Sequence, residues 1–167
     1  MNPMNIKLFL LFLFLAASFF FSSSCKKQVY VYDYYGHLAT DEKIIDKYLA
    51  DSSITAEKSS SGLRYVIHKP GFGSYPAAGK TVRLNYRGTL LDGTEFESSF
   101  NNQVPYEFVV GYGEVIAGMD EGIQYIAEGG SITIYVPSPL AYKETAQGSI
   151  IKPNSILVFY MELLKVQ

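Results

Sequence analysis

The feature that most constrains this sequence is a series of short stretches, spread over residues 62–167, in which apolar and polar residues alternate. The clearest are Thr81–Arg87 and Ser155–Val166. Each places its apolar side chains on one face: Val82, Leu84 and Tyr86 in the first, and Leu157, Phe159, Met161 and Leu163 in the second. Alternation with a period of two predicts β-strands with one buried face. This part of the chain must therefore form a sheet whose apolar face is covered.

Other segments complete the predicted sheet and supply the cover. Further strands are expected at Leu63–His68, Tyr106–Val110 and Ser131–Val136, with a short one at Ile54–Lys58. One segment, Val115–Tyr125, has helical spacing, with its apolar residues on one face and Glu128-Gly129-Gly130 ending it. Five or six strands and one short helix predict an α+β fold, in which an antiparallel sheet buries one face against the helix.

The N-terminal residues have the pattern of a targeting signal rather than of a folded element. Lys7 precedes the apolar run 8–17, which is too short for a membrane span of roughly 20 residues. A basic residue, a short apolar core and small residues are typical of a secretory signal, here residues 1–24. The alternatives are an uncleaved N-terminal anchor, or a signal cut elsewhere that leaves Cys25 free.

Cys25, the only cysteine of the chain, stands at the predicted cut. It resembles the acceptor of a bacterial lipoprotein signal, although Ser22 occupies a position where Leu is usual. We therefore expect lipidation at Cys25, which gives stable attachment to a membrane. Lys26-Lys27 lacks the acidic residue that marks inner-membrane retention in some bacteria. The expected location is thus the cell envelope, facing the periplasm and anchored in the outer membrane.

Residues 25–61 are predicted to be a lipid-anchored tether with a short helix. Thr40 is the expected N-cap of a helix over Asp41–Asp51, whose apolar residues recur at helical spacing. A helix of about three turns is too short to be stable alone. It must dock on the domain formed by residues 62–167 or on a second copy of the chain.

Composition excludes several classes of function. The formal net charge is −2 for the 167 residues, so there is no basic excess to neutralise phosphates, which argues against nucleic acid as a partner. One Cys and two His rule out a disulfide framework and leave almost nothing for a metal centre or a His-dependent nucleophile. No cofactor and no metal are expected.

Five motifs, taken together, resemble one known family. In chain order they are Tyr86-Arg87-Gly88, residues 92–99 (DGTEFESS), Pro105-Tyr106-Glu107-Phe108, residues 113–122 (GEVIAGMDEG) and residues 149–159 (SIIKPNSILVF). Each is weak alone, but five in order resemble the FKBP family of peptidyl-prolyl cis-trans isomerases over residues 62–167. The cysteine, tether and domain together also resemble isomerase lipoproteins of the Bacteroidetes, some of them linked to gliding motility.

The resemblance implies a fold, an activity and a site. It implies a twisted antiparallel sheet curled round a short helix, with a pocket between them that binds proline-containing polypeptides and turns their X–Pro bonds. The implied catalytic residues are Tyr142, Phe96 and Glu97. The Tyr142 hydroxyl is expected to bond a substrate carbonyl, as is the backbone N–H of Ile116. The implied substrate-binding residues are Tyr86, Tyr106, Val115, Ile116, Met119, Ile150, Ile151 and Phe159.

Three departures from the family keep a second function open. Met119 stands where the family usually has Trp at the pocket floor, Glu97 replaces an Asp, and Lys143 follows Tyr142 where a Gly is usual. Met119 offers less flat surface to a proline ring, so activity and affinity for a macrolide ligand are both open. The two functions are a membrane-anchored isomerase of envelope proteins and a non-catalytic binding or chaperone module that uses the same pocket.

Overall fold

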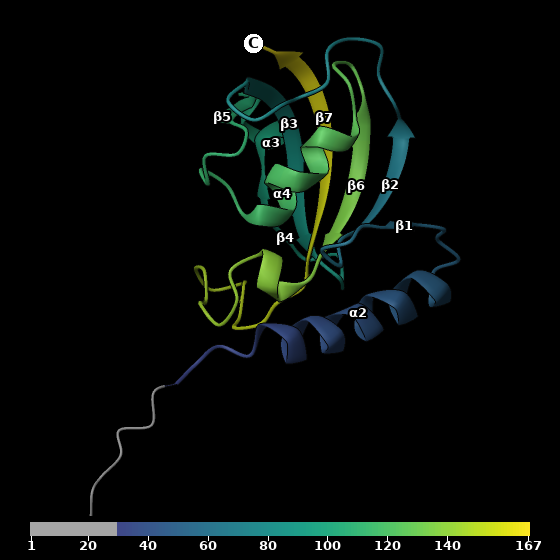
Figure 1. Ribbon diagram of the computed structural model, residues 1–167, viewed down its shortest axis with the longest axis vertical. Helices are drawn as coiled ribbons and strands as arrows, with labels where there is room; N and C mark the ends of the chain where they lie inside the picture. The colour runs from purple at the N-terminus through teal and green to yellow at the C-terminus, as the bar shows by residue number, and fades with distance from the viewer. Residues whose placement is uncertain (1–29) are drawn as a thin grey trace, which may run out of the picture. The chain divides into compact units, whose positions relative to one another are not determined.

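Seven antiparallel strands form the sheet in a computed structural model that describes residues 30–167. The predicted signal, residues 1–24, and Cys25 lie outside the described residues. The strand order is β1-β2-β6-β7-β3-β4, with β5 pairing to β3 (Figure 1). The strands are β1 (Glu57–Lys58), β2 (Arg64–Lys69), β3 (Thr81–Leu90), β4 (Glu95–Ser98), β5 (Tyr106–Val109), β6 (Ser131–Val136) and β7 (Leu157–Val166).

The predicted α+β architecture with an antiparallel sheet is confirmed, although the sheet has seven strands where five or six were predicted. The alternating residues of β3 and β7 are buried on one face, as their patterns predict. The strand that the sequence analysis missed is β4, whose four residues include only one that is fully buried. A strand this short and this exposed carries no clear period-two signal.

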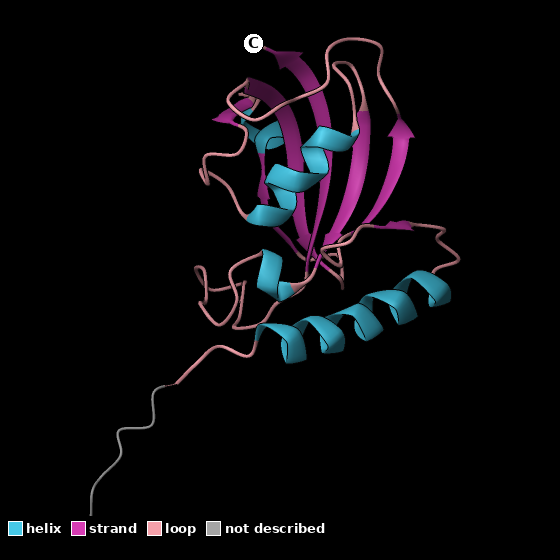
Figure 2. Cartoon of the chain, in the orientation of Figure 1, coloured by secondary structure: helices cyan, strands magenta, loops and turns pink. Residues whose placement is uncertain are grey.

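The helical segment covers the buried face of the sheet (Figure 2). It is shorter than predicted: α4 spans Ala117–Gly122 and continues as a 3₁₀ turn, η1, over Ile123–Tyr125. Val115 lies in a bend before it, and Ile116, the N-cap residue, has extended backbone. The close approach of α4 to β6 depends on two glycines. A Cβ on Gly118 would collide with Val136, and one on Gly122 would lie 2.8 Å from Ile134 Cγ2.

A second helix, α2 (Tyr34–Asp51), packs outside this core and begins earlier than predicted. Its N-cap is Asp33, whose side chain accepts a hydrogen bond from Gly36 N, so the predicted N-cap Thr40 lies inside the helix. There Thr40 Oγ1 donates to Gly36 O instead. Ile45 and Leu49 of α2 are buried in a separate cluster with Tyr135 of β6 and with Ile156. Of the two docking partners expected for this helix, the structure shows the domain that follows it.

Two short helical elements complete the fold: α3 (Ser99–Asn102) follows β4, and η2 (Ser138–Leu140) follows β6. A long loop then connects η2 to β7. Within residues 30–167 no helix is both long enough and apolar enough to cross a membrane. Asp33–Gln167 form one compact unit, to which the descriptions below refer.

Candidate active site

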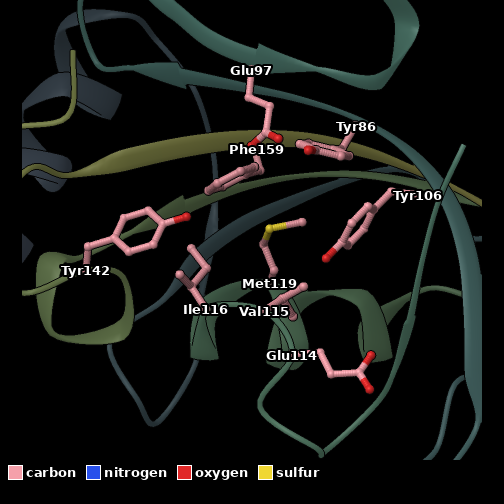
Figure 3. A pocket seen from close by; sticks show the side chains of 9 residues that line it. All are labelled: Tyr86, Glu97, Tyr106, Glu114, Val115, Ile116, Met119, Tyr142 and Phe159. Atoms are coloured by element: carbon pink, nitrogen blue, oxygen red, sulfur yellow. The ribbon is translucent and has the colours of Figure 1, made fainter. Parts of the chain in front are cut away.

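A cavity of about 230 Å³ lies between the sheet and the start of α4 (Figure 3). The sheet contributes residues from β3, β4, β5 and β7, while the segment before α4, α4 itself and the loop after η2 contribute the others. Eight of the eleven predicted pocket residues line it. The complete lining is Tyr86, Glu97, Tyr106, Glu114, Val115, Ile116, Met119, Tyr142 and Phe159.

The other three predicted residues line a neighbouring cavity of about 380 Å³. Its lining is Phe96, Glu97, Tyr142, Gln147, Gly148, Ser149, Ile150 and Ile151. Because Glu97 and Tyr142 belong to both linings, these two side chains stand where the cavities adjoin. The predicted residues therefore line two adjoining cavities.

Contacts between aromatic rings connect the walls of the two cavities. The Phe159 ring meets the Phe96 ring edge to face, with centroids 5.6 Å apart, and lies 6.3 Å from the Tyr86 ring. Tyr86 in turn meets Tyr106 at 5.7 Å. These arrangements are those that aromatic pairs prefer. Phe159 is almost fully buried, so the cluster is both core and cavity wall.

The floor of the first cavity is formed by α4 and the residues just before it. Figure 3 shows the Met119 thioether directed into the centre of the hollow, with Val115 and Ile116 beside it. The carbonyl of Ile116 accepts hydrogen bonds from Met119 N at 3.0 Å and Asp120 N at 3.1 Å, which fixes the first turn of α4. Met119 therefore provides a flexible, polarisable surface on this floor.

The polar groups at the cavity are tyrosine hydroxyls and carboxylates. Burial, together with a hydrogen bond to Glu97, raises the pKa of Tyr86. Burial and the charge of Glu97 also raise the pKa of Tyr142. A tyrosine hydroxyl already keeps its proton at neutral pH, and these shifts widen that range, so both groups can act as donors. In Figure 3 the Tyr142 hydroxyl points into the hollow.

In the first cavity Glu114 is the lining residue that the sequence analysis missed; in the second, Gln147, Gly148 and Ser149 were missed. The Oε2 of Glu114 accepts a hydrogen bond from Val109 N at 2.9 Å. The Asp120 carboxylate likewise accepts from Gly111 N at 2.9 and 3.0 Å. These bonds hold the connection between β5 and α4, and so place Val115 and Ile116. The only available signal for Glu114 was its position, directly before Val115 in one of the five motifs.

The described part of the chain, residues 30–167, contains no group of three or more His, Cys, Asp or Glu residues that could hold a metal ion.

Comparisons with known proteins show which family this chain resembles. The family model for the FKBP-type peptidyl-prolyl cis-trans isomerase matches residues 73–164. A probable FKBP-type peptidyl-prolyl cis-trans isomerase FkpA of Neisseria meningitidis is 39% identical over 140 residues, which cover 74% of this chain and 51% of that protein. The peptidyl-prolyl cis-trans isomerase Fkbp12 of Drosophila melanogaster is 42% identical over 107 residues, covering 64% of this chain and 99% of that protein.

A solved structure extends the likeness to the whole chain. The crystal structure of FkpA from Escherichia coli superposes with a TM-score of 0.68 at 32% sequence identity, covering 100% of this chain and 74% of that chain. The chain spans only about half the length of the Neisseria relative.

Proposed function

This chain belongs to the FKBP-type peptidyl-prolyl cis-trans isomerase family, and from that premise we propose that it catalyses rotation about X–Pro bonds in polypeptides. The observation that supports the proposal most is the convergence of eight predicted residues on one cavity walled by aromatic and branched side chains. The substrate class is proline-containing polypeptides, and the reaction needs neither a metal nor a cofactor.

The physical basis is the polarity of the amide. Rotation about a peptide bond is opposed by about 18–20 kcal/mol of lost resonance. X–Pro bonds populate both isomers, yet they interconvert over tens to hundreds of seconds. In the twisted transition state the resonance is broken and the carbonyl is less polar than in the planar amide. An apolar cavity that excludes water therefore favours the twisted state over the planar one.

The role proposed for each residue follows from the cavity that it lines. Met119, Tyr86 and Phe159 grip the proline ring in the first cavity. Phe96 with Ile150 and Ile151 receives the preceding residue in the second cavity. Tyr142, at the junction of the two cavities, donates a hydrogen bond to a substrate carbonyl and holds the backbone while the amide turns. Tyr142, like any tyrosine at neutral pH, carries the proton that it would donate, and burial raises its pKa further.

The test is a protease-coupled assay of a proline-containing peptide, with the whole chain in mild detergent. Tyr142→Phe and Phe96→Ala should each lower kcat/KM about tenfold, because one hydrogen bond or ring contact contributes roughly 1–1.5 kcal/mol. The matched control is Tyr112→Phe. This tyrosine is 72% exposed and lies outside both linings, so the rate should not change.

The assay also separates catalysis from binding alone. Met119 on the floor favours a binding or chaperone module as the second candidate, because a thioether supports a proline ring less well than an indole. A folded protein that binds the peptide but gives no rate above background would leave only that candidate. We also propose that a macrolide binds in the same cavity, which competition by FK506 against the peptide measures.

We further propose that the chain is a lipoprotein of the cell envelope, anchored through Cys25 and facing the periplasm from the outer membrane. The support is the signal-like segment that ends at the only cysteine. Cys25→Ala should release the protein from the membrane fraction, whereas the unaltered chain should remain there through a high-salt wash. Unchanged partitioning of the variant would contradict lipidation at this residue.

A further inference from the structure

A buried carboxylate on α2 reaches the backbone that carries Tyr142. Asp41 is only 4% exposed, and its Oδ2 accepts hydrogen bonds from Ser138 N at 2.7 Å and from Ser138 Oγ at 2.6 Å. Ser138, the first residue of η2, is completely buried and lies 97 residues further along the chain. A buried carboxylate is tolerated only where hydrogen-bond donors surround it, and here the N–H and the hydroxyl of Ser138 are the two donors.

Ser138 in turn holds both sides of Tyr142. Its carbonyl accepts hydrogen bonds from Ala141 N and from Lys143 N, each at 3.0 Å. Lys143 has left-handed backbone, with φ of 56°, and its carbonyl accepts from Asn154 N at 2.7 Å. The two residues that flank Tyr142 are therefore tied to one serine, which Asp41 fixes.

A second contact joins the same helix to the same loop. His37 Nε2 lies 3.7 Å from Glu144 Oε1, two residues beyond Tyr142. Figure 1 shows α2 passing beside the yellow-green loop that contains η2. Helix α2 lies before residues 73–164, so the family match does not include it.

Asp41 is not what attaches α2 to the sheet. Ile45 and Leu49 pack into their own apolar cluster, and Asp46 pairs with Arg64 of β2 at 2.8 Å through both carboxylate oxygens. The helix thus has an anchor that does not involve Ser138. The contact between Asp41 and Ser138 adds a connection to the site.

We propose that Asp41 is a positioning residue, which orients the Tyr142 hydroxyl through Ser138; the proposal rests on the isomerase function proposed above. Without the carboxylate, the Ser138 N–H and hydroxyl lose their acceptor and the turn that ends in Lys143 relaxes. A hydroxyl displaced by about 1 Å no longer meets the carbonyl at the right distance. Helix α2 is then a part of the catalytic unit, not only a spacer between the N-terminal segment and the domain.

The experiment is a double-mutant cycle in the peptide assay. Asp41→Ala should lower kcat/KM about tenfold in the unaltered chain and less than about twofold in Tyr142→Phe, because the hydroxyl through which it acts is absent there. Asp41→Asn keeps an oxygen that can accept both bonds and should recover most of the rate. Ser138→Ala, which removes only one donor, should give a smaller loss with the same dependence on Tyr142.

The matched control is Asp46→Ala, the same substitution on the same helix. It should lower the free energy of unfolding and leave kcat/KM unchanged at temperatures where the protein is folded. Equal losses from Asp41→Ala in both Tyr142 backgrounds would overturn the proposal, since the residue would then act on the fold alone.

Amide hydrogen exchange keeps this proposal separate from the isomerase function. Asp41→Ala should speed exchange at Ala141 and Lys143, and Asp46→Ala should not. If the unaltered chain has no isomerase activity, the proposed function fails, while faster exchange at these two amides still supports control of the loop by Asp41. Unchanged exchange at both would overturn that control whatever the activity.

Discussion

Gly88 on β3 is the residue that allows the two phenylalanines of the site to meet. A Cβ at this position would lie 2.5 Å from Cε2 and Cζ of Phe96 and 3.0 Å from Cε1 of Phe159. One or both rings would have to move. The edge-to-face pair that joins the two cavities thus depends on a residue that has no side chain.

Gly88→Ala should therefore affect both stability and activity. Overpacking of this kind costs about 1–3 kcal/mol, and displaced rings should lower kcat/KM several-fold. The measurements are urea unfolding and the peptide assay. Gly93→Ala is the control, since its φ of 86° strains any side chain while nothing lies within 4 Å of the added Cβ. Gly93→Ala should lose stability and keep its rate; an equally active Gly88→Ala would show that the rings do not set the site.

Single residues also show how far the sequence could predict the site. The residues around Tyr86, Val115 and Phe159 stand in motifs of fixed spacing, so their convergence could be expected. The division into two cavities could not, because it depends on the path of the loop that carries Tyr142 and Ile151. Glu114 was missed because a carboxylate in a bend shows no pattern in the sequence, whereas in the structure its side chain accepts a hydrogen bond from Val109 N.

At the scale of elements, Arg64 of β2 joins the sheet to α2. It is 4% exposed, forms a two-pronged pair with Asp46 and donates to Glu42 at 3.2 Å and to the Gly62 carbonyl at 2.7 Å. A hydrogen bond from Lys58, with Arg64 adding to the effect, lowers the pKa of Glu42. A planar guanidinium can make all these bonds at once, and an ammonium cannot.

Arg64→Lys should accordingly lower the free energy of unfolding by about 1–2 kcal/mol, because buried acceptors lose their donors. The same substitution at Arg83 is the control. Arg83 is exposed and pairs with Glu107 at 3.6 Å, and surface pairs of this kind contribute about 0–1 kcal/mol. Urea unfolding of the two variants measures the difference. Equal losses would mean that the network around Arg64 does not attach α2.

The start of α2 shows why some boundaries escape prediction. Thr40 followed by Asp41 and Glu42 is a pattern typical of a helix N-terminus, yet the helix begins earlier, at Tyr34. The added turns contain Gly36 and adjacent tyrosines, which show no helical period. They form because Asp33 caps them and because Tyr34 packs on the main core, a tertiary contact that local sequence does not reveal.

At the scale of the whole molecule, the ionisation of tyrosines makes the stability of the fold depend on pH in the alkaline range. The pKa is raised for Tyr65, Tyr86, Tyr125, Tyr135, Tyr142 and Tyr160. The main cause is burial for four of them, and a hydrogen bond to a carboxylate for Tyr65 and Tyr160. Four of these residues belong to strands, Tyr125 belongs to η1 and Tyr142 to the loop after η2. Their protonation therefore supports the core, the site and, through Tyr135, the contact with α2.

The free energy of unfolding should therefore fall steadily as pH rises above about 10. A group whose pKa is higher in the folded state gives stability that is complete below its unfolded value and is lost towards its folded value. For Tyr125 this window runs from 10 to about 12, since burial, and then a hydrogen bond to Glu121, raise its pKa. Urea unfolding at several pH values from about 8 to 12 measures the slope. Tyr125→Phe should make the slope shallower. Gly93→Ala, which removes no ionisable group, should lower the free energy of unfolding at every pH and leave its slope against pH unchanged. A slope unchanged by Tyr125→Phe would contradict the raised pKa.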